Sequence, residues 1–176
     1  MLDVAVASQP AAAAQGVSEQ GASAIRGLPS NLVELTQPEL RDMIKDEYKT
    51  LLIMTGGVEN NDGNLAMNKH NVNIKLLGEM IAREIGKTLV APLEPGNAGA
   101  NIQIGQAGPM LTQATYVAVL YDMDNFRRNA AFTKIYSMGD SGGNGRGMQA
   151  AAHSLAKIYA NSPDCNCAIR SSDSNC

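Results

Sequence analysis

The side chains best suited to chemistry lie in segments rich in glycine and asparagine. Ser141 lies within Gly139-Asp140-Ser141-Gly142-Gly143, which matches the G-x-S-x-G pattern of a serine nucleophile on a turn between a strand and a helix. Such a serine needs a base, and the chain has two histidines, His70 and His153. His153 lies about three turns along the expected helix and is too far to reach back. A Ser141–His70 pair is therefore one hypothesis, and the alternative is a glycine turn whose N–H groups bind an anion.

A divalent-metal site is a second hypothesis for the same part of the chain. Glu59 and His70 flank a polar segment and are suitable metal ligands, and Asp140 could supply another carboxylate. The alternative roles are structural. Glu59 and Asp140 could hydrogen-bond within their loops, as acidic residues in turns commonly do, and His70 could be a polar residue at the start of a helix.

Both hypotheses require segments far apart in sequence to meet, and the expected elements would bring them together. Continuous apolar runs predict buried strands at 50–55, 87–93 and 132–138. Helical spacing of apolar residues predicts helices at 37–48, at about 70–85, from Thr112 through Phe126, and from Met148 through Ile158. The first of these helices opens with the capping box Thr36-Gln37-Pro38-Glu39.

Three cycles of strand, loop and helix imply right-handed crossovers and a parallel sheet, so the fold class is α/β. The polar segments 56–70, 94–109 and 139–147 each follow one of the strands. We therefore expect them to gather at the carboxyl edge of the sheet, where open α/β folds place their sites.

The composition excludes several classes of function. The chain has 176 residues, 44% of them hydrophobic, which is enough for one domain with a core. A net charge of -3 and the absence of tryptophan argue against nucleic acid as a partner, because phosphate binding needs clustered Lys and Arg. The apolar runs are far shorter than the ~20 residues of a membrane span. The charged side chains of the third helix, expected to form a solvated face, are Asp122, Asp124, Arg127 and Arg128.

The two ends of the chain differ from its centre. Residues 1–31 form an Ala/Gln/Ser-rich arm, 32–160 the α/β domain, and 161–176 a tail. Ala5-Val6-Ala7 is similar to the end of a signal peptide, which would indicate a secreted or periplasmic protein, and a plain Ala-rich arm is the alternative. All three cysteines lie in the tail, where a disulfide is favoured over a metal site (Cys165, Cys167 and Cys176).

Several segments resemble, in order, motifs of the creatininase (creatinine amidohydrolase) family. Thr55–Asn61 (TGGVENN) followed by Leu65–Asn71 (LAMNKHN) resembles the family's first metal-binding segment. Leu89–Asn97 resembles its second strand and loop, and Ser137–Asn144 (SMGDSGGN) is similar to its glycine loop. The Lys-His-Asn and Gly-Asp-Ser-Gly-Gly forms match an exported branch of the family better. The resemblance covers about residues 32–160.

This resemblance implies a three-layer α/β fold with a mainly parallel sheet and hydrolysis of an amide by two divalent ions, zinc or manganese. By position, Glu59 keeps the ligand carboxylate and His70 stands where the family has an aspartate. Asn61 and Ser141 replace ligand histidines and are poor ligands for such ions, so the metal motifs are degenerate. Relative to the family the chain is C-terminally shortened, since a later segment with another acidic ligand does not follow.

Three functions are consistent with these observations. The first is a metal-dependent amidohydrolase acting on a C–N bond of a small molecule, with Glu59, His70 and Asp140 as the surviving ligands; loss of the other ligands would impair this activity. The second is a non-catalytic pseudoenzyme that serves as a self-assembling structural or binding subunit. The third is a serine hydrolase that uses Ser141. We also expect a homo-oligomer, because a three-stranded sheet leaves an exposed edge and partly uncovered helices.

Overall fold

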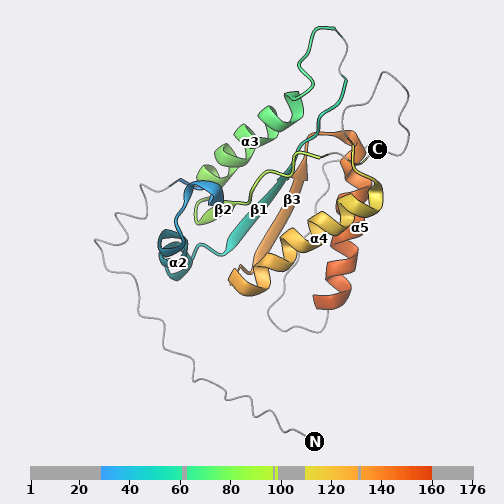
Figure 1. Ribbon diagram of the computed structural model, residues 1–176. Helices are drawn as coiled ribbons and strands as arrows, with labels where there is room; N and C mark the ends of the chain where they lie inside the picture. The colour runs from blue at the N-terminus through green and yellow to red at the C-terminus, as the bar shows by residue number, and fades with distance from the viewer. Residues whose placement is uncertain (1–28, 61–62, 97, 99–109, 131, 160–176) are drawn as a thin grey trace, which may run out of the picture.

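A three-stranded parallel sheet forms the centre of the computed structural model, which describes residues 29–60, 63–96, 98, 110–130 and 132–159. Its strands are β1 (Thr50–Thr55), β2 (Thr88–Val90) and β3 (Lys134–Gly139), in the order β2-β1-β3. In the register, Leu51 of β1 lies beside Leu89 of β2 and Ile135 of β3. The predicted α/β class and parallel pairing are confirmed (Figure 1).

Helices cover both faces of this sheet and complete three layers. Helix α3 (Lys69–Ile85) lies on one face, while α4 (Gln113–Ala130) and α5 (Gly145–Tyr159) lie on the other (Figure 1). Alternate residues of β1 divide between two cores, as the two-residue period of a strand requires. Leu51 and Ile53 pack on the α4–α5 side, and Leu52 and Met54 pack on the α3 side.

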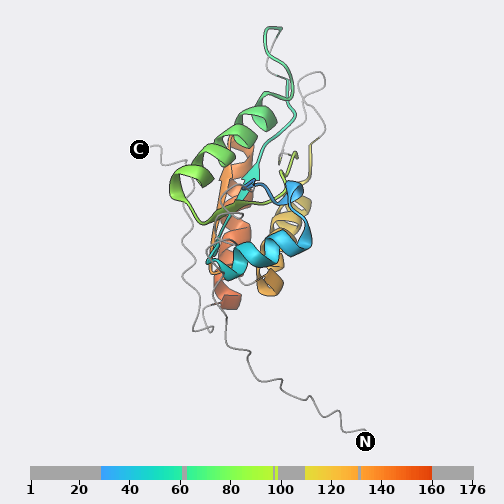
Figure 2. The ribbon, with the colours of Figure 1, turned by 90° about the vertical axis from the view of Figure 1, so that its left-hand side faces the viewer.

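Two short elements precede β1. The 3-10 helix η1 (Leu32–Glu34) leads to α2 (Gln37–Lys45), which packs on the α4 side of the sheet (Figure 2). The predicted capping box at Thr36 and Glu39 is confirmed. The predicted helix was three residues too long, because the backbone turns at Glu47, whose φ of 65° lies in the left-handed region.

Close packing of α3 on the sheet depends on one glycine. A Cβ atom on Gly78 would lie 2.8 Å from Cγ of Met54, so the missing side chain lets the helix approach β1. Ile74 and Ala82, one turn before and one turn after, are buried in the same core. Small residues at this contact therefore set the distance between the helix and the sheet.

Two expectations about side chains differ from the structure. The apolar side chains that predicted α3 are mostly exposed rather than packed on the sheet: Val72 and Leu76, for example, are 60% and 59% exposed, whereas Ile74, which was not among them, is buried. Asp124, expected on a solvated face of α4, is only 4% exposed. Apolar residues lie on most sides of α3, so their spacing alone could not identify the face that contacts the sheet.

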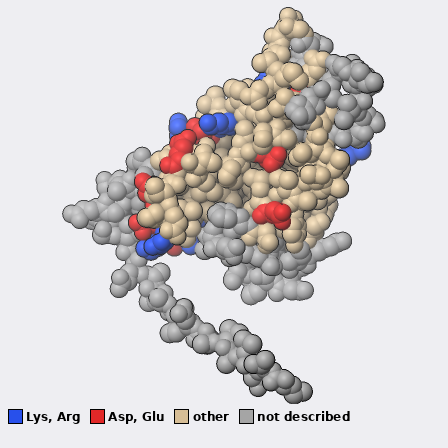
Figure 3. Space-filling model, in the orientation of Figure 1, with Lys and Arg blue, Asp and Glu red and all other residues tan. Residues whose placement is uncertain are grey.

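The remaining features bear on partners. None of the described helices is both long and apolar enough to cross a membrane. On the face shown in Figure 3, Lys and Arg side chains are few and scattered, and they form no extended basic patch. Most of the arm 1–31, the signal-like Ala5-Val6-Ala7, the tail 161–176 and the three cysteines fall outside the described residues.

Candidate functional site

His70 joins three segments of the chain at the carboxyl edge of the sheet. It lies in the first turn of α3, and its side chain is 11% exposed. Nδ1 of the ring is 2.7 Å from Oδ2 of Asp140, which directly follows β3. Nε2 is 2.9 Å from Oε1 of Glu59, in the loop after β1. The structure thus brings together the three side chains that the sequence singled out as possible metal ligands.

The chemistry of this cluster follows from its hydrogen bonds. Ionised carboxylates accept hydrogen bonds and do not donate them, so a ring protonated on both nitrogens can donate to Glu59 and Asp140 together. A neutral ring could donate to one of them only. The carboxylate side chains are 28% and 32% exposed, respectively, so water or a substrate can reach them, whereas the ring between them is nearly enclosed. The cluster can therefore bind a cationic group or exchange protons with a bound molecule.

A buried asparagine holds the loop that carries Glu59. Oδ1 of Asn71 accepts a hydrogen bond from the Gly57 N–H at 2.9 Å, and its Nδ2 donates to Oδ1 of Asn68 at 2.6 Å. A Cβ atom on Gly56 would lie 1.8 Å from that same Oδ1, so only glycine fits there. Because Asn71 follows His70 in α3, this contact fixes the loop that carries Glu59 against the helix that carries His70.

Asn144 ties the third loop to the other two. Its side chain is fully buried, and its Nδ2 donates to the Gly56 carbonyl at 2.7 Å and to Oγ1 of Thr55 at 3.3 Å. Its Oδ1 accepts from the Ala98 N–H at 3.0 Å. These bonds join the end of β1, the segment after β2 and the turn after β3. The predicted meeting of the three loops is confirmed for their described residues.

Sequence reasoning did not identify Asn71 or Asn144. Both were present in the segments that it selected, but an asparagine in a glycine-rich loop usually forms a local turn. The available signal was their position. Asn71 follows His70 in the first turn of α3. Asn144 lies four residues after Asp140 and directly before α5.

Ser141 lies close to the cluster in sequence but is not joined to its histidine. It is 4% exposed and precedes the 3-10 helix η2 (Gly142–Asn144), where its carbonyl accepts from the Asn144 N–H. Both nitrogens of His70 already face carboxylates. His153 is exposed on α5. The geometry therefore gives the serine hydrolase hypothesis no base for its nucleophile among the described residues.

Some of the side chains in this cluster are placed as ligands of a divalent ion would be. Oε1 of Glu59 and Nε2 of His70 are neighbours, and Asp140 on the other ring nitrogen matches the arrangement in which a carboxylate orients a metal-bound histidine. Within the described ranges no group of three or more His, Cys, Asp and Glu side chains is arranged to hold an ion. Asn61, which stands at a ligand position of the family pattern, lies outside those ranges.

Comparison with known proteins identifies the fold. No family model matches the chain, and no curated protein matches it. Among solved structures, a creatininase variant superimposes with a TM-score of 0.69 at 18% identity, over 81% of this chain and 58% of that one. The chain has the creatininase fold. A manganese form of creatininase gives a TM-score of 0.68 at 20% identity, over 82% of this chain and 58% of that one.

A third solved structure, of a creatinine amidohydrolase (creatininase), gives a TM-score of 0.65 at 19% identity, over 81% of this chain and 57% of that one. The resemblance indicated by the sequence motifs is thus confirmed at the level of the fold. The creatininase fold also agrees with the three-layer arrangement of helices around a parallel sheet. The chain spans less than two thirds of the length of these solved structures.

Proposed function

We propose that this chain is a creatininase-like hydrolase that acts on an amide or cyclic amide C–N bond of a small molecule. The observation that carries the proposal is the placement of His70 between Glu59 and Asp140 at the carboxyl edge of a creatininase fold. One of the solved creatininases is a complex with the small molecule creatine. The two partly exposed carboxylates give such a molecule access to the cluster.

The protons of the reaction can be assigned to these residues. Hydrolysis joins the water oxygen to the carbonyl carbon and breaks the C–N bond, and a proton from water must reach the leaving nitrogen. The side chain of Glu59 is 28% exposed, so its carboxylate can accept that proton from the attacking water and then donate it to the leaving nitrogen. Asp140 holds the ring through Nδ1 and keeps its orientation.

A divalent ion is part of the proposal, since solved creatininases include a manganese form and a zinc–zinc form. Glu59 and Nε2 of His70 are the described donors that would hold it, with Asp140 orienting the ring. When bound, such an ion polarises the amide carbonyl and lowers the pKa of water. The remaining donors would have to come from outside the described residues or from the substrate.

A non-catalytic subunit on the same fold is the second candidate. It is favoured by the two contacts of His70, because a ring that donates to both carboxylates already neutralises part of their charge without an ion. A catalytic zinc site usually has three protein ligands, and the described part of the chain provides two adjacent donors.

Metal content and amide hydrolysis, measured on one preparation, separate these candidates. For the hydrolase we expect near-stoichiometric zinc or manganese and turnover within a panel of linear and cyclic amides that includes creatinine. Both should fall in Glu59→Gln and remain in His153→Gln, which alters the exposed histidine of α5. A folded protein with no metal and no turnover would favour the non-catalytic subunit. Turnover that is lost in Ser141→Ala but not in Glu59→Gln would instead support the serine hydrolase.

A further inference from the structure

The outward face of α3 presents apolar side chains to solvent. Val72, Leu76 and Met80 follow one another at intervals of one turn and are 60%, 59% and 54% exposed. Leu77, beside them, is 44% exposed. The opposite side of the helix is the one that packs on the sheet. A row of this kind is unusual for a surface helix, whose outward face is ordinarily polar.

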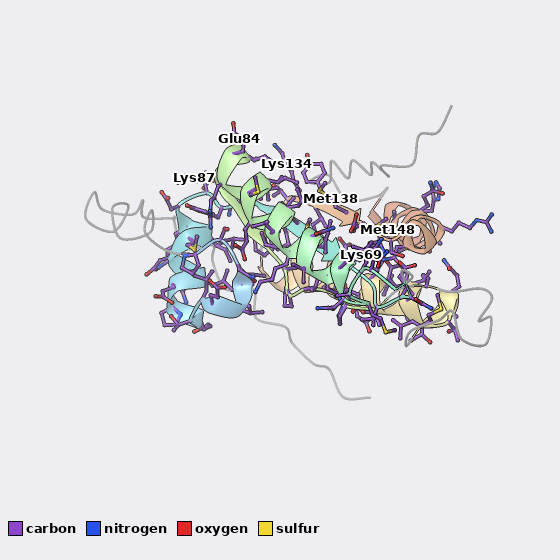
Figure 4. The ribbon with its side chains drawn as sticks, turned by 90° about the horizontal axis from the view of Figure 1, so that it is seen from above. Lys69, Glu84, Lys87, Lys134, Met138 and Met148 are labelled. Carbon is purple, nitrogen blue, oxygen red and sulfur yellow. The ribbon has the colours of Figure 1, made fainter. Side chains whose placement is uncertain are left out.

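Opposite charges lie at the two ends of this row. Lys69 is the first residue of α3, and Glu84 lies in its last turn, about 22 Å away along the axis. Figure 4 shows them toward opposite ends of the helix. The spacing from Lys69 to Leu76, Met80 and Glu84 keeps all four on one stripe.

Both charges are unfavourable within their own helix. A helix N-terminus is partly positive and favours acidic residues, and its C-terminus favours basic ones. The first turn of α3 contains no acidic residue, and its first residue is Lys69. Arg83 in the last turn is favourably placed, and it also lies 3.7 Å from Glu79 of the same helix. A partner that brought a negative charge to Lys69 and a positive charge to Glu84 would satisfy both.

A second copy of the helix, running in the opposite direction, has this pattern of charge. We propose that two copies of the chain associate through the outward faces of antiparallel α3 helices. In the register that sets Lys69 of one copy against Glu84 of the other, Leu76 lies opposite Leu77, and a two-fold axis forms each contact twice. A parallel pair would instead set like charges together. The inference does not depend on the proposed hydrolytic activity.

Charge exchange tests the register. Sedimentation velocity of the full chain over about 1–100 µM should show a concentration-dependent dimer that weakens with added salt. Lys69→Glu and Glu84→Lys should each raise the dimer dissociation constant about tenfold, since each replaces two attractions by two repulsions. The double variant, Lys69→Glu with Glu84→Lys, restores opposite charges and should recover most of the affinity. A folded double variant that stays dissociated would overturn this register.

A matched pair of valines tests the surface itself. Val72→Lys places a charge in the apolar row and should dissociate the dimer over the same concentrations. Val33→Lys is the control, because Val33 is 64% exposed on η1, beside Val119 and Met123 of α4. Circular dichroism of each variant establishes that the helices are intact. A native chain that is monomeric throughout, or an oligomer that Val72→Lys leaves unchanged, would overturn the proposal.

Discussion

Substitution of Asn144 by alanine gives the most direct test of how the site is held together. The change removes the donor to the Gly56 carbonyl and the acceptor for the Ala98 N–H, both in a buried setting. Each buried backbone group left without a partner costs about 1–3 kcal/mol, so the free energy of unfolding should fall by about 2–6 kcal/mol. That is a large part of the ~5–15 kcal/mol by which domains are stable.

Urea denaturation and thermal melting both measure this loss. For a chain of this length a loss of about 4 kcal/mol corresponds to a fall in Tm of roughly 8–16 °C. Asn144→Asp keeps the shape and the acceptor but removes the donor and buries a charge, so we expect at least as large a loss. Asn64→Ala, at an exposed position of the loop before α3, is the control and should change stability by less than about 0.5 kcal/mol. A loss below about 1 kcal/mol in Asn144→Ala would refute the argument that these loops depend on it.

Three further substitutions and one control test other features. Gly78→Ala should cost about 1–3 kcal/mol in urea denaturation, because its Cβ would meet Met54, whereas Gly142→Ala, with open space around it, should be near neutral. Hydrogen bonds from Thr36 lower the pKa of Glu39, so Glu39→Ala should destabilise the protein near neutral pH. That difference should vanish as the pH falls from 4.5 through the lowered pKa of the folded state. Burial raises the pKa of Tyr116 well above its usual range, so the stability it confers should decline as the pH rises past 10.0, and Tyr116→Phe should lack that decline.

The helices and strands and their order could be predicted because each has a recognisable local sequence pattern. The apolar run at 50–55 coincides with β1, and the Thr36 capping box marks the start of α2. Parallel pairing then follows from the alternation of strands and helices, and it places the loops at one edge. The approach of His70 to Glu59 and Asp140 was therefore accessible in outline from the sequence.

The side-chain contacts depended on information that no local pattern contains. The roles of Asn71 and Asn144 arise from backbone groups on other strands, which are distant in sequence. The burial of Asp124 depends on how α4 is rotated against α5 and β3. On α3, apolar residues occur on most sides of the helix, and the side that meets the sheet is identified by the packing of Ile74, Gly78 and Ala82 against the strands.

The amide side chains that join the loops have a consequence for how this edge can change over evolution. Asn71 and Asn144 are neutral at every pH at which proteins fold, and their partners are backbone groups and the side chains of Asn68 and Thr55, none of which belongs to the histidine cluster. The hydrogen bonds of Asn71 and Asn144 that join the loops therefore do not depend on which residues occupy positions 59, 70 and 140. Mutations there can exchange acids, bases and ligands while the loops keep their places, so descendants of one scaffold can diverge in reactivity without first losing their shape.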